Sequence, residues 1–289
     1  MLTVAAWAVG VLLVLYAGFL VLAYASHDRV AFAGAGRKVK PAECGFAVED
    51  LYLPVVDSAR AGSRGDVVHA WWVPVAAKDA STLLFFHGNG YPLEQEAVRE
   101  APMLRKAGAN LLLMDYRGYG ESTLLKPSGA TTAADARAGL RHLTEERGIP
   151  LSRIWIGGRS LGSAVAVRLA AEYPGCAGLI LITPITNTVD VKPVGPWLLP
   201  LRWFGLARDF DSRTRISRLN LPVLIVTGTL DRVATPKMAA ALHRRVRGPK
   251  RLELFEGVGH NTIWQISGAR ISALIAEMMR SACAADQQQ

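Results

Sequence analysis

The chain has 289 residues, of which 51% are hydrophobic and 20% are charged, and its mean hydropathy is +0.21. This composition is more apolar than that of a typical soluble domain and excludes a disordered or fibrous protein. The three cysteines, Cys44, Cys176 and Cys283, are odd in number and far apart. They therefore predict neither a disulfide scaffold nor a zinc site of familiar spacing.

The charge balance is basic, because 33 Lys and Arg stand against 24 Asp and Glu, a net charge of +9. Much of the excess follows the N-terminal apolar segment or lies within residues 208–218 and 244–251. Such clusters suit an anionic membrane surface or solvated helix faces. Nucleic-acid binding is a further interpretation, but the sequence carries no helix-turn-helix, zinc-finger or RNA-binding motif, so we expect no nucleic-acid partner.

The first predicted element is an uncharged apolar run over residues 2–25. As a helix it would be about 36 Å long, enough to cross a hydrocarbon core of roughly 30 Å. A cleaved signal peptide is the alternative, since Ala23-Tyr24-Ala25 fits the small-x-small cleavage pattern, although the run is long for a signal sequence. We expect a single-pass membrane anchor at 1–26 and a basic linker at 27–44. The Lys and Arg residues that follow the span favour a cytoplasmic catalytic domain.

Residues 45–285 alternate β-branched apolar runs with longer helical patterns, which predicts one α/β domain with a mostly parallel sheet and helices on both faces. An antiparallel hairpin is expected first, at 46–55 and 66–75. Buried strands are then expected at 82–86, 110–114, 153–157, 178–182, 223–227 and 251–255. Helices are expected between and after them, at 93–107, 133–147, 161–173, 236–246 and 261–280.

The segment 184–220 interrupts this alternation. It carries Pro193, Pro196 and Pro200 among several large apolar residues between two predicted strands. This pattern predicts a small lid that lines an acyl pocket or touches a membrane; an ordinary capping helix packed on the core is the alternative.

Gly158-Arg159-Ser160-Leu161-Gly162 lies between a predicted strand and a predicted helix. This is the context of a nucleophile elbow, in which a strained turn exposes the serine hydroxyl and small residues on either side let strand and helix approach. A serine needs a base, and the base needs an acid to fix its tautomer. Each of the two follows a later predicted strand: Asp231 comes after 223–227 and His260 after 251–255.

The other candidates for these roles are weaker. Asp209 and Asp211, in the lid region, are reserve acids. Among the remaining histidines, His27 and His69 precede the parallel strands, and His87 is expected to bond within its own turn. His142 and His243 lie on predicted helices at positions that look like surface.

Acyl transfer also needs two hydrogen-bond donors for the oxyanion. We assign them to the backbone N–H groups of Leu161 and Asn89, the latter in His87-Gly88-Asn89-Gly90 directly after a predicted strand; Gly90 or Tyr91 could replace Asn89. The polar loop after residue 114 is expected to brace the elbow, with Asp115 and Arg117 in structural roles. The sequence shows neither a phosphate-binding loop nor a metal-ligand cluster, so we expect no cofactor and no metal.

With these motifs in place, the chain resembles the membrane-anchored α/β-hydrolase-domain serine hydrolases over about residues 48–276. The resemblance rests on His-Gly-Asn-Gly at 87–90, Asp-Tyr-Arg-Gly-Tyr-Gly-x-Ser at 115–122, Gly-Arg-Ser-Leu-Gly at 158–162, Gly-Thr-x-Asp at 228–231 and Gly-His-Asn-x-x-Trp at 259–264. It implies an α/β-hydrolase fold and the same triad, Ser160, Asp231 and His260. One departure is Ser163, where relatives often carry a second glycine.

The resemblance also implies ester, thioester or lipid substrates. Together these patterns predict a membrane-tethered serine hydrolase that works through an acyl-Ser160 intermediate. A peptidase of the same fold and a catalytically silent binding or scaffold protein are the alternatives. The oligomeric state stays open.

Overall fold

The computed structural model describes residues 2–36, 46–57, 65–77, 79–191 and 209–286. Eight strands of this part of the chain form one sheet in the order β1-β2-β4-β3-β5-β6-β7-β8. Only the pairs β1–β2 and β2–β4 are antiparallel; every other neighbouring pair is parallel. The strand bounds are β1 Glu49–Pro54, β2 Val67–Val73, β3 Thr82–Phe86, β4 Asn110–Met114, β5 Ile154–Arg159, β6 Gly178–Ile182, β7 Val223–Gly228 and β8 Lys250–Phe255.

Helices cover both faces of the sheet, and each face has its own apolar cluster. On one face lie α3 (Gly129–Arg141), α4 (Leu161–Glu172), α6 (Ser212–Ile216) and α7 (Pro236–Arg245). On the other face lie α2 (Leu93–Arg105) and α8 (Ile263–Asp286). Because both faces are covered, the central strands β3, β5, β6 and β7 are buried throughout, which explains their nearly continuous apolar sequences. The predicted α/β-hydrolase fold is confirmed.

The predicted elements differ from the observed ones chiefly at their ends. The helix expected at 133–147 begins four residues earlier, because Ser128 and Thr131 form a reciprocal capping box. It then passes into a π-helical turn, His142–Glu146. The placement of His142 on the surface was wrong: its side chain is buried, and its two ring nitrogens bond to Glu146 and Arg147.

Short helical turns complete the described chain at Leu151–Arg153 and Thr188–Asp190. In the segment expected to form a lid, the structure describes only the two ends, namely the turn at Thr188–Asp190 and the five-residue helix α6. The prolines at 193, 196 and 200 lie outside the described residues, so the lid stays a prediction.

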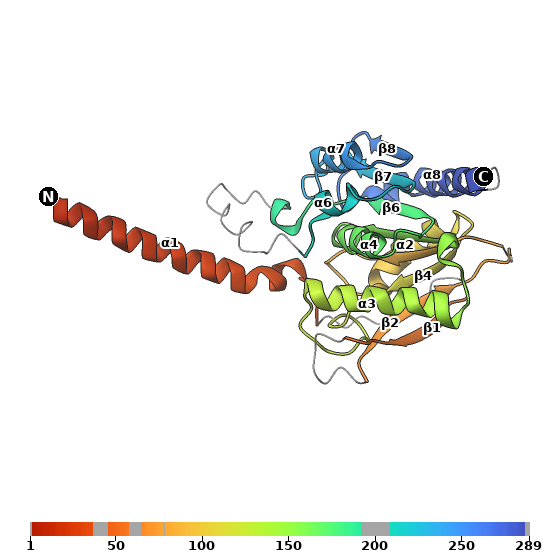
Figure 1. Ribbon diagram of the computed structural model, residues 1–289, viewed down its shortest axis with the longest axis horizontal. Coiled ribbons are helices and arrows are strands. Elements are labelled where there is room, and N and C mark those ends of the chain that lie inside the picture. Colours follow the sequence, from red (N-terminus) through yellow and green to blue (C-terminus); the bar gives the residue numbers. More distant parts are fainter. Residues whose placement is uncertain (1, 37–45, 58–64, 78, 192–208, 287–289) are drawn as a thin grey trace.

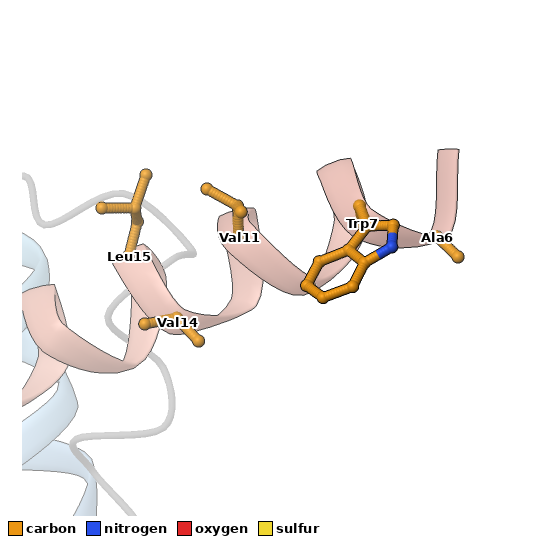
Figure 2. A pocket seen from close by; sticks show the side chains of 6 residues that line it. Ala6, Trp7, Val11, Val14 and Leu15 are labelled. Atoms are coloured by element: carbon orange, nitrogen blue, oxygen red, sulfur yellow. The ribbon is translucent and has the colours of Figure 1, made fainter. Parts of the chain in front are cut away.

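The helix α1 (Leu2–Ala31) projects from the body as one rod with the N-terminus at its far end (Figure 1). Its segment Val4–Ser26 has a mean hydropathy of 2.4, with 0% of its most apolar window buried. Figure 2 shows Trp7, Val11, Val14 and Leu15 projecting from this rod around a shallow hollow lined by α1 residues alone. The helix is long and apolar enough to cross a membrane, a property that a signal sequence shares.

Candidate active site

The turn between β5 and α4 holds Ser160 in a backbone conformation that residues other than glycine rarely adopt, with φ 52° and ψ −116°. Two close backbone approaches surround it. A Cβ at Gly158 would lie 2.2 Å from the carbonyl oxygen of Gly162, and a Cβ at Gly162 would lie 2.1 Å from that of Phe86. The flanking glycines are therefore sterically required, and the observed strain at a strand-to-helix turn is the geometry of a nucleophile elbow.

A carboxylate and an imidazole meet at the carboxyl ends of β7 and β8. Asp231 Oδ2 lies 2.7 Å from His260 Nδ1, while Asp231 Oδ1 accepts the N–H groups of Val233 and Ala234, each at 2.8 Å. The Asp231 side chain is completely buried, and its carboxylate can only accept when ionised. With Asp231 ionised, His260 Nδ1 is the donor in this bond, which leaves Nε2 as the nitrogen that can take up a proton.

The two reserve acids are engaged elsewhere. Asp211 Oδ1 accepts the N–H of Thr214 and caps α6, and Asp209 Oδ1 lies 3.8 Å from Arg168. The assignment of the acid to Asp231 thus has geometric support.

The serine and histidine loops are tied together by a side chain that sequence reasoning missed. Arg159 Nη2 donates to Asn261 Oδ1 at 3.4 Å, joining the residue before Ser160 to the residue after His260. A direct bond from Ser160 Oγ to His260 is not among the hydrogen bonds of the described residues, and such bonds often tighten only when substrate binds.

Two further buried groups support Arg159. Glu100 Oε1 accepts from Arg159 Nη1 at 3.3 Å and from Trp264 Nε1 at 3.0 Å. These bonds connect the elbow with α2 and with the start of α8. The sequence signal for this network was Arg159 itself, a charged residue inside the Gly-x-Ser-x-Gly motif.

The loop after β3 lies directly beside the elbow: a Cβ at Gly88 would sit 3.7 Å from Ser160 Cβ. Each carbonyl oxygen of residues 87–89 accepts a hydrogen bond from a side chain. The hydroxyl of Tyr116 donates to His87 O at 2.8 Å, His87 Nδ1 donates to Gly88 O at 2.6 Å, and the hydroxyl of Tyr119 donates to Asn89 O at 3.1 Å. His87 thus bonds within its own turn, as expected.

One of the two expected oxyanion donors, the N–H of Leu161, lies in the elbow itself. Leu161 is the first residue of α4, where a backbone N–H has no carbonyl partner one turn earlier in the helix. A helix N-terminus also favours negative charge. The elbow and the loop after β3 therefore bring the predicted donors of Leu161 and Asn89 to the same strand-end edge.

Comparisons with known proteins identify the family of the chain. The family model described as serine aminopeptidase S33 matches residues 78–208. An uncharacterized protein of Mycobacterium tuberculosis is 35% identical over 217 residues, which cover 74% of this chain and 73% of that protein. The α/β hydrolase domain-containing protein 17B of Homo sapiens is 32% identical over 201 residues, covering 70% and 67% respectively. The chain belongs to the α/β-hydrolase-domain family.

Solved structures show the same fold at lower identity. The Pyrococcus furiosus esterase Pf2001 superposes with a TM-score of 0.65 at 18% identity, covering 86% of this hydrolase and 96% of the esterase. The haloalkane dehalogenase DbeA from Bradyrhizobium elkani superposes with a TM-score of 0.61 at 16% identity, covering 83% of this hydrolase and 100% of the dehalogenase. Since one fold carries both chemistries, the reaction of this hydrolase must be argued from its site residues.

Below the site, the hydrolase buries the loop that was expected to brace the elbow. Asp115 Oδ1 contacts His87 Nε2 at 2.9 Å and accepts the N–H of Leu93 at 3.0 Å. Burial alone would raise the pKa of the Asp115 carboxyl, but the histidines His69 and His87 outweigh burial and lower that pKa. Asp115 therefore holds the loop after β3 in place through His87 and Leu93.

Arg117 is completely buried and contacts three carboxylates, Asp135 at 2.6 Å, Asp66 at 2.9 Å and Asp57 at 3.0 Å. These partners come from three separate segments of the chain, and none belongs to the loops that carry Ser160 or His260. Arg117 thus holds segments together, in agreement with the structural role expected from the sequence.

Ser163, which stands where relatives often carry a second glycine, has a structural role. Ser163 Oγ donates to the carbonyl of Ser160 at 2.5 Å and accepts the N–H of Ile185 at 3.2 Å. The hydroxyl thus links the elbow to the segment after β6. Among the described residues, no group of three His, Cys, Asp or Glu side chains is placed to hold a metal ion.

Proposed function

We propose that this chain is a membrane-tethered serine hydrolase that cleaves a carboxylic ester or thioester of a lipid or acyl-linked substrate. The observation that carries the proposal is the strained Ser160 at a strand-to-helix turn, on the same sheet edge as the hydrogen-bonded pair Asp231–His260. Ser160 is buried, with 7% of its surface exposed, and a strained backbone of this kind persists mainly where function requires it.

In the proposed mechanism, His260 Nε2 takes the proton of Ser160 Oγ as the oxygen attacks the substrate carbonyl. Asp231 stabilises the imidazolium that forms. The oxyanion of the tetrahedral intermediate accepts hydrogen bonds from the N–H groups of Leu161 and Asn89. Collapse expels the alcohol or thiol, which receives the proton from His260 and leaves an acyl-Ser160 ester. Water, deprotonated by His260, then attacks this ester; the bond between the acyl carbon and Ser160 Oγ breaks, Oγ takes back the proton from His260, and the carboxylic acid leaves.

The apolar helix α1 supports the tethering and the substrate class. Its exposed Trp7, Val11, Val14 and Leu15 would be unfavourable in water and suit a lipid environment (Figure 2). The span at 2–25 would leave the catalytic domain on the cytoplasmic side, because Arg29 and the basic cluster at 37–40 follow it. An enzyme held at a membrane meets lipid-linked esters there at high local concentration.

Labelling with a fluorophosphonate probe tests the mechanism, because it captures an activated serine without knowledge of the substrate. The full-length protein in mild detergent would be compared with Ser160→Ala, His260→Ala and the control Ser281→Ala, which changes an exposed serine on α8. We expect labelling of the wild type and the control only. Absence of labelling in folded wild type would refute the mechanism and favour a catalytically silent protein.

A substrate panel then separates esterase from peptidase. We expect turnover of p-nitrophenyl butyrate, p-nitrophenyl palmitate or palmitoyl-coenzyme A, and none of alanine p-nitroanilide. Preferential cleavage of the anilide would support the peptidase alternative instead.

A further inference from the structure

The end of α1 packs into the hydrolase body at residues 31–36, which we call the junction. Ala31 and Phe32 are buried in the main apolar cluster. The N–H of Phe32 still donates to Asp28 O at 2.9 Å, so the helix is continuous up to the point where it enters the core. The apolar rod and the catalytic body are therefore joined by packed structure.

The junction contacts the loop that carries the proposed oxyanion donor. The N–H of Gly34 donates to Asn89 O at 2.8 Å, and the N–H of Gly36 donates to Gly118 O at 2.7 Å. A Cβ at Gly34 would lie 2.6 Å from both the carbonyl carbon and the carbonyl oxygen of Gly90. Only glycine allows the two backbones to approach this closely.

This contact holds one of the two peptide units that flank Asn89, the one that carries the N–H of Gly90. A peptide unit is planar, so its C=O and N–H directions are fixed relative to each other. The peptide before Asn89 is held by the bond of His87 Nδ1 to Gly88 O, and the peptide after it by the bonds of Gly34 and Tyr119 to Asn89 O. Fixing both planes fixes the direction of the N–H of Asn89 and also that of Gly90.

Phe32 supports the same contact from the side. Its ring packs edge-on against Tyr119, with centroids 6.5 Å apart, and against Phe210 at 6.0 Å. Tyr119 in turn packs against the His87 ring at 5.4 Å while its hydroxyl donates to Asn89 O. The contact between Phe32 and Tyr119 therefore holds the Tyr119 hydroxyl where it can donate to the carbonyl oxygen of Asn89.

We propose that the junction is a positioning element for catalysis, in which Gly34 and Phe32 hold the Asn89–Gly90 peptide so that an oxyanion donor faces the Ser160 side of the loop. The end of the membrane helix thus completes the hydrolytic site. This inference rests on the proposed function. Removing an oxyanion donor outright lowers kcat by about 10²–10³-fold, so misdirecting one should cost about 10-fold or more.

The test uses full-length protein in detergent, with p-nitrophenyl butyrate as substrate and fluorophosphonate titration to count active sites. Gly34→Ala would force the junction away from the loop. Gly18→Ala, in open space on α1, is the matched control. Tyr119→Phe removes one of the two donors to Asn89 O while keeping the ring. Hydrogen–deuterium exchange of peptides spanning residues 87–93 reports the loop independently of activity.

We expect Gly34→Ala to lower kcat per titrated site about 10-fold or more, with KM within about twofold, and to speed exchange in the loop. Tyr119→Phe should show the same pattern at about threefold to 10-fold. Gly18→Ala should match the wild type. A kcat per titrated site that stays at the wild-type level in Gly34→Ala, whether or not exchange changes, overturns the inference.

Failure of the proposed function would give a different set of results. If wild type neither labels nor turns over ester, the proposed function falls and the catalytic role of the junction falls with it, even where Gly34→Ala speeds loop exchange. A Gly34→Ala protein whose KM rises with unchanged kcat would also contradict the inference, because positioning of an oxyanion donor acts on the transition state.

Discussion

Replacing Arg117 by methionine should destabilise the protein strongly without touching the catalytic groups. The guanidinium is fully buried among three carboxylates at 2.6 to 3.0 Å, and its removal leaves Asp57, Asp66 and Asp135 uncompensated. Breaking a buried pair by removing one partner costs about 3–5 kcal/mol, a large part of a total stability of about 5–15 kcal/mol. Arg117→Lys, which keeps the charge but lacks the planar fork, should fall between wild type and Arg117→Met.

The loss should depend on pH. Burial raises the pKa of the Asp135 carboxyl to about 6, against the pull of Arg117. Without Arg117 that pKa rises further, so the folded variant binds protons more tightly than folded wild type does. The destabilisation should therefore be largest near pH 8 and shrink toward pH 5.

Urea unfolding followed by tryptophan fluorescence measures this effect. The matched control is Arg137→Met, which removes a half-exposed partner of Glu172 and should cost about 1 kcal/mol or less. Equal losses of unfolding free energy for Arg117→Met and Arg137→Met would refute the reasoning. Fluorophosphonate labelling per folded molecule should stay at the wild-type level in both variants.

Three further predictions follow from the described contacts. Asp231→Asn should lower ester kcat by about 10³–10⁴-fold, since the amide no longer enforces the His260 tautomer; a loss under 10-fold in steady-state assays would contradict this. Burial disfavours the charged His69 ring, but the carboxylates of Asp115 and Asp50 outweigh burial and raise its pKa from 6.5 to about 9. The protonated ring should therefore add up to about 3 kcal/mol to the free energy of unfolding, in full below pH 6.5 and lost by pH 9. Urea unfolding of His69→Gln at a series of pH values should lack this pH dependence. Ser163→Ala should cost about 1–3 kcal/mol in urea unfolding because the N–H of Ile185 loses its buried acceptor, and an unchanged midpoint would contradict this.

The sequence predicts the local elements of the sheet well and its long-range arrangement poorly. The strands β3, β4 and β6 coincide with the predicted ranges, because continuous apolar runs bounded by turn residues leave little freedom. The strand order, in which β4 lies between β2 and β3, follows from packing between distant segments that no local pattern encodes.

At the site, chain order and strand-end placement were enough to nominate Ser160, Asp231 and His260. What local patterns could not supply was the support around them. His142 was placed on the surface from its position on a predicted helix, but Glu146 and Arg147 bond to its ring inside the protein. The Arg159 bond to Asn261 joins residues 102 apart, and the Gly34 contact joins the loop to a segment that appeared to be only a linker.

The packed junction also limits how far the catalytic body can travel. A flexible linker lets a domain explore a volume that grows with linker length. Here α1 is helical to Ala31 and the next residue is already buried, so a molecule with α1 in a bilayer would hold its body next to the lipid surface, at the end of the rod (Figure 1). Under the proposed tethering and ester chemistry, the protein would search for substrate in two dimensions, by lateral diffusion among molecules of its own membrane, and the abundance of esters in that leaflet would govern its rate.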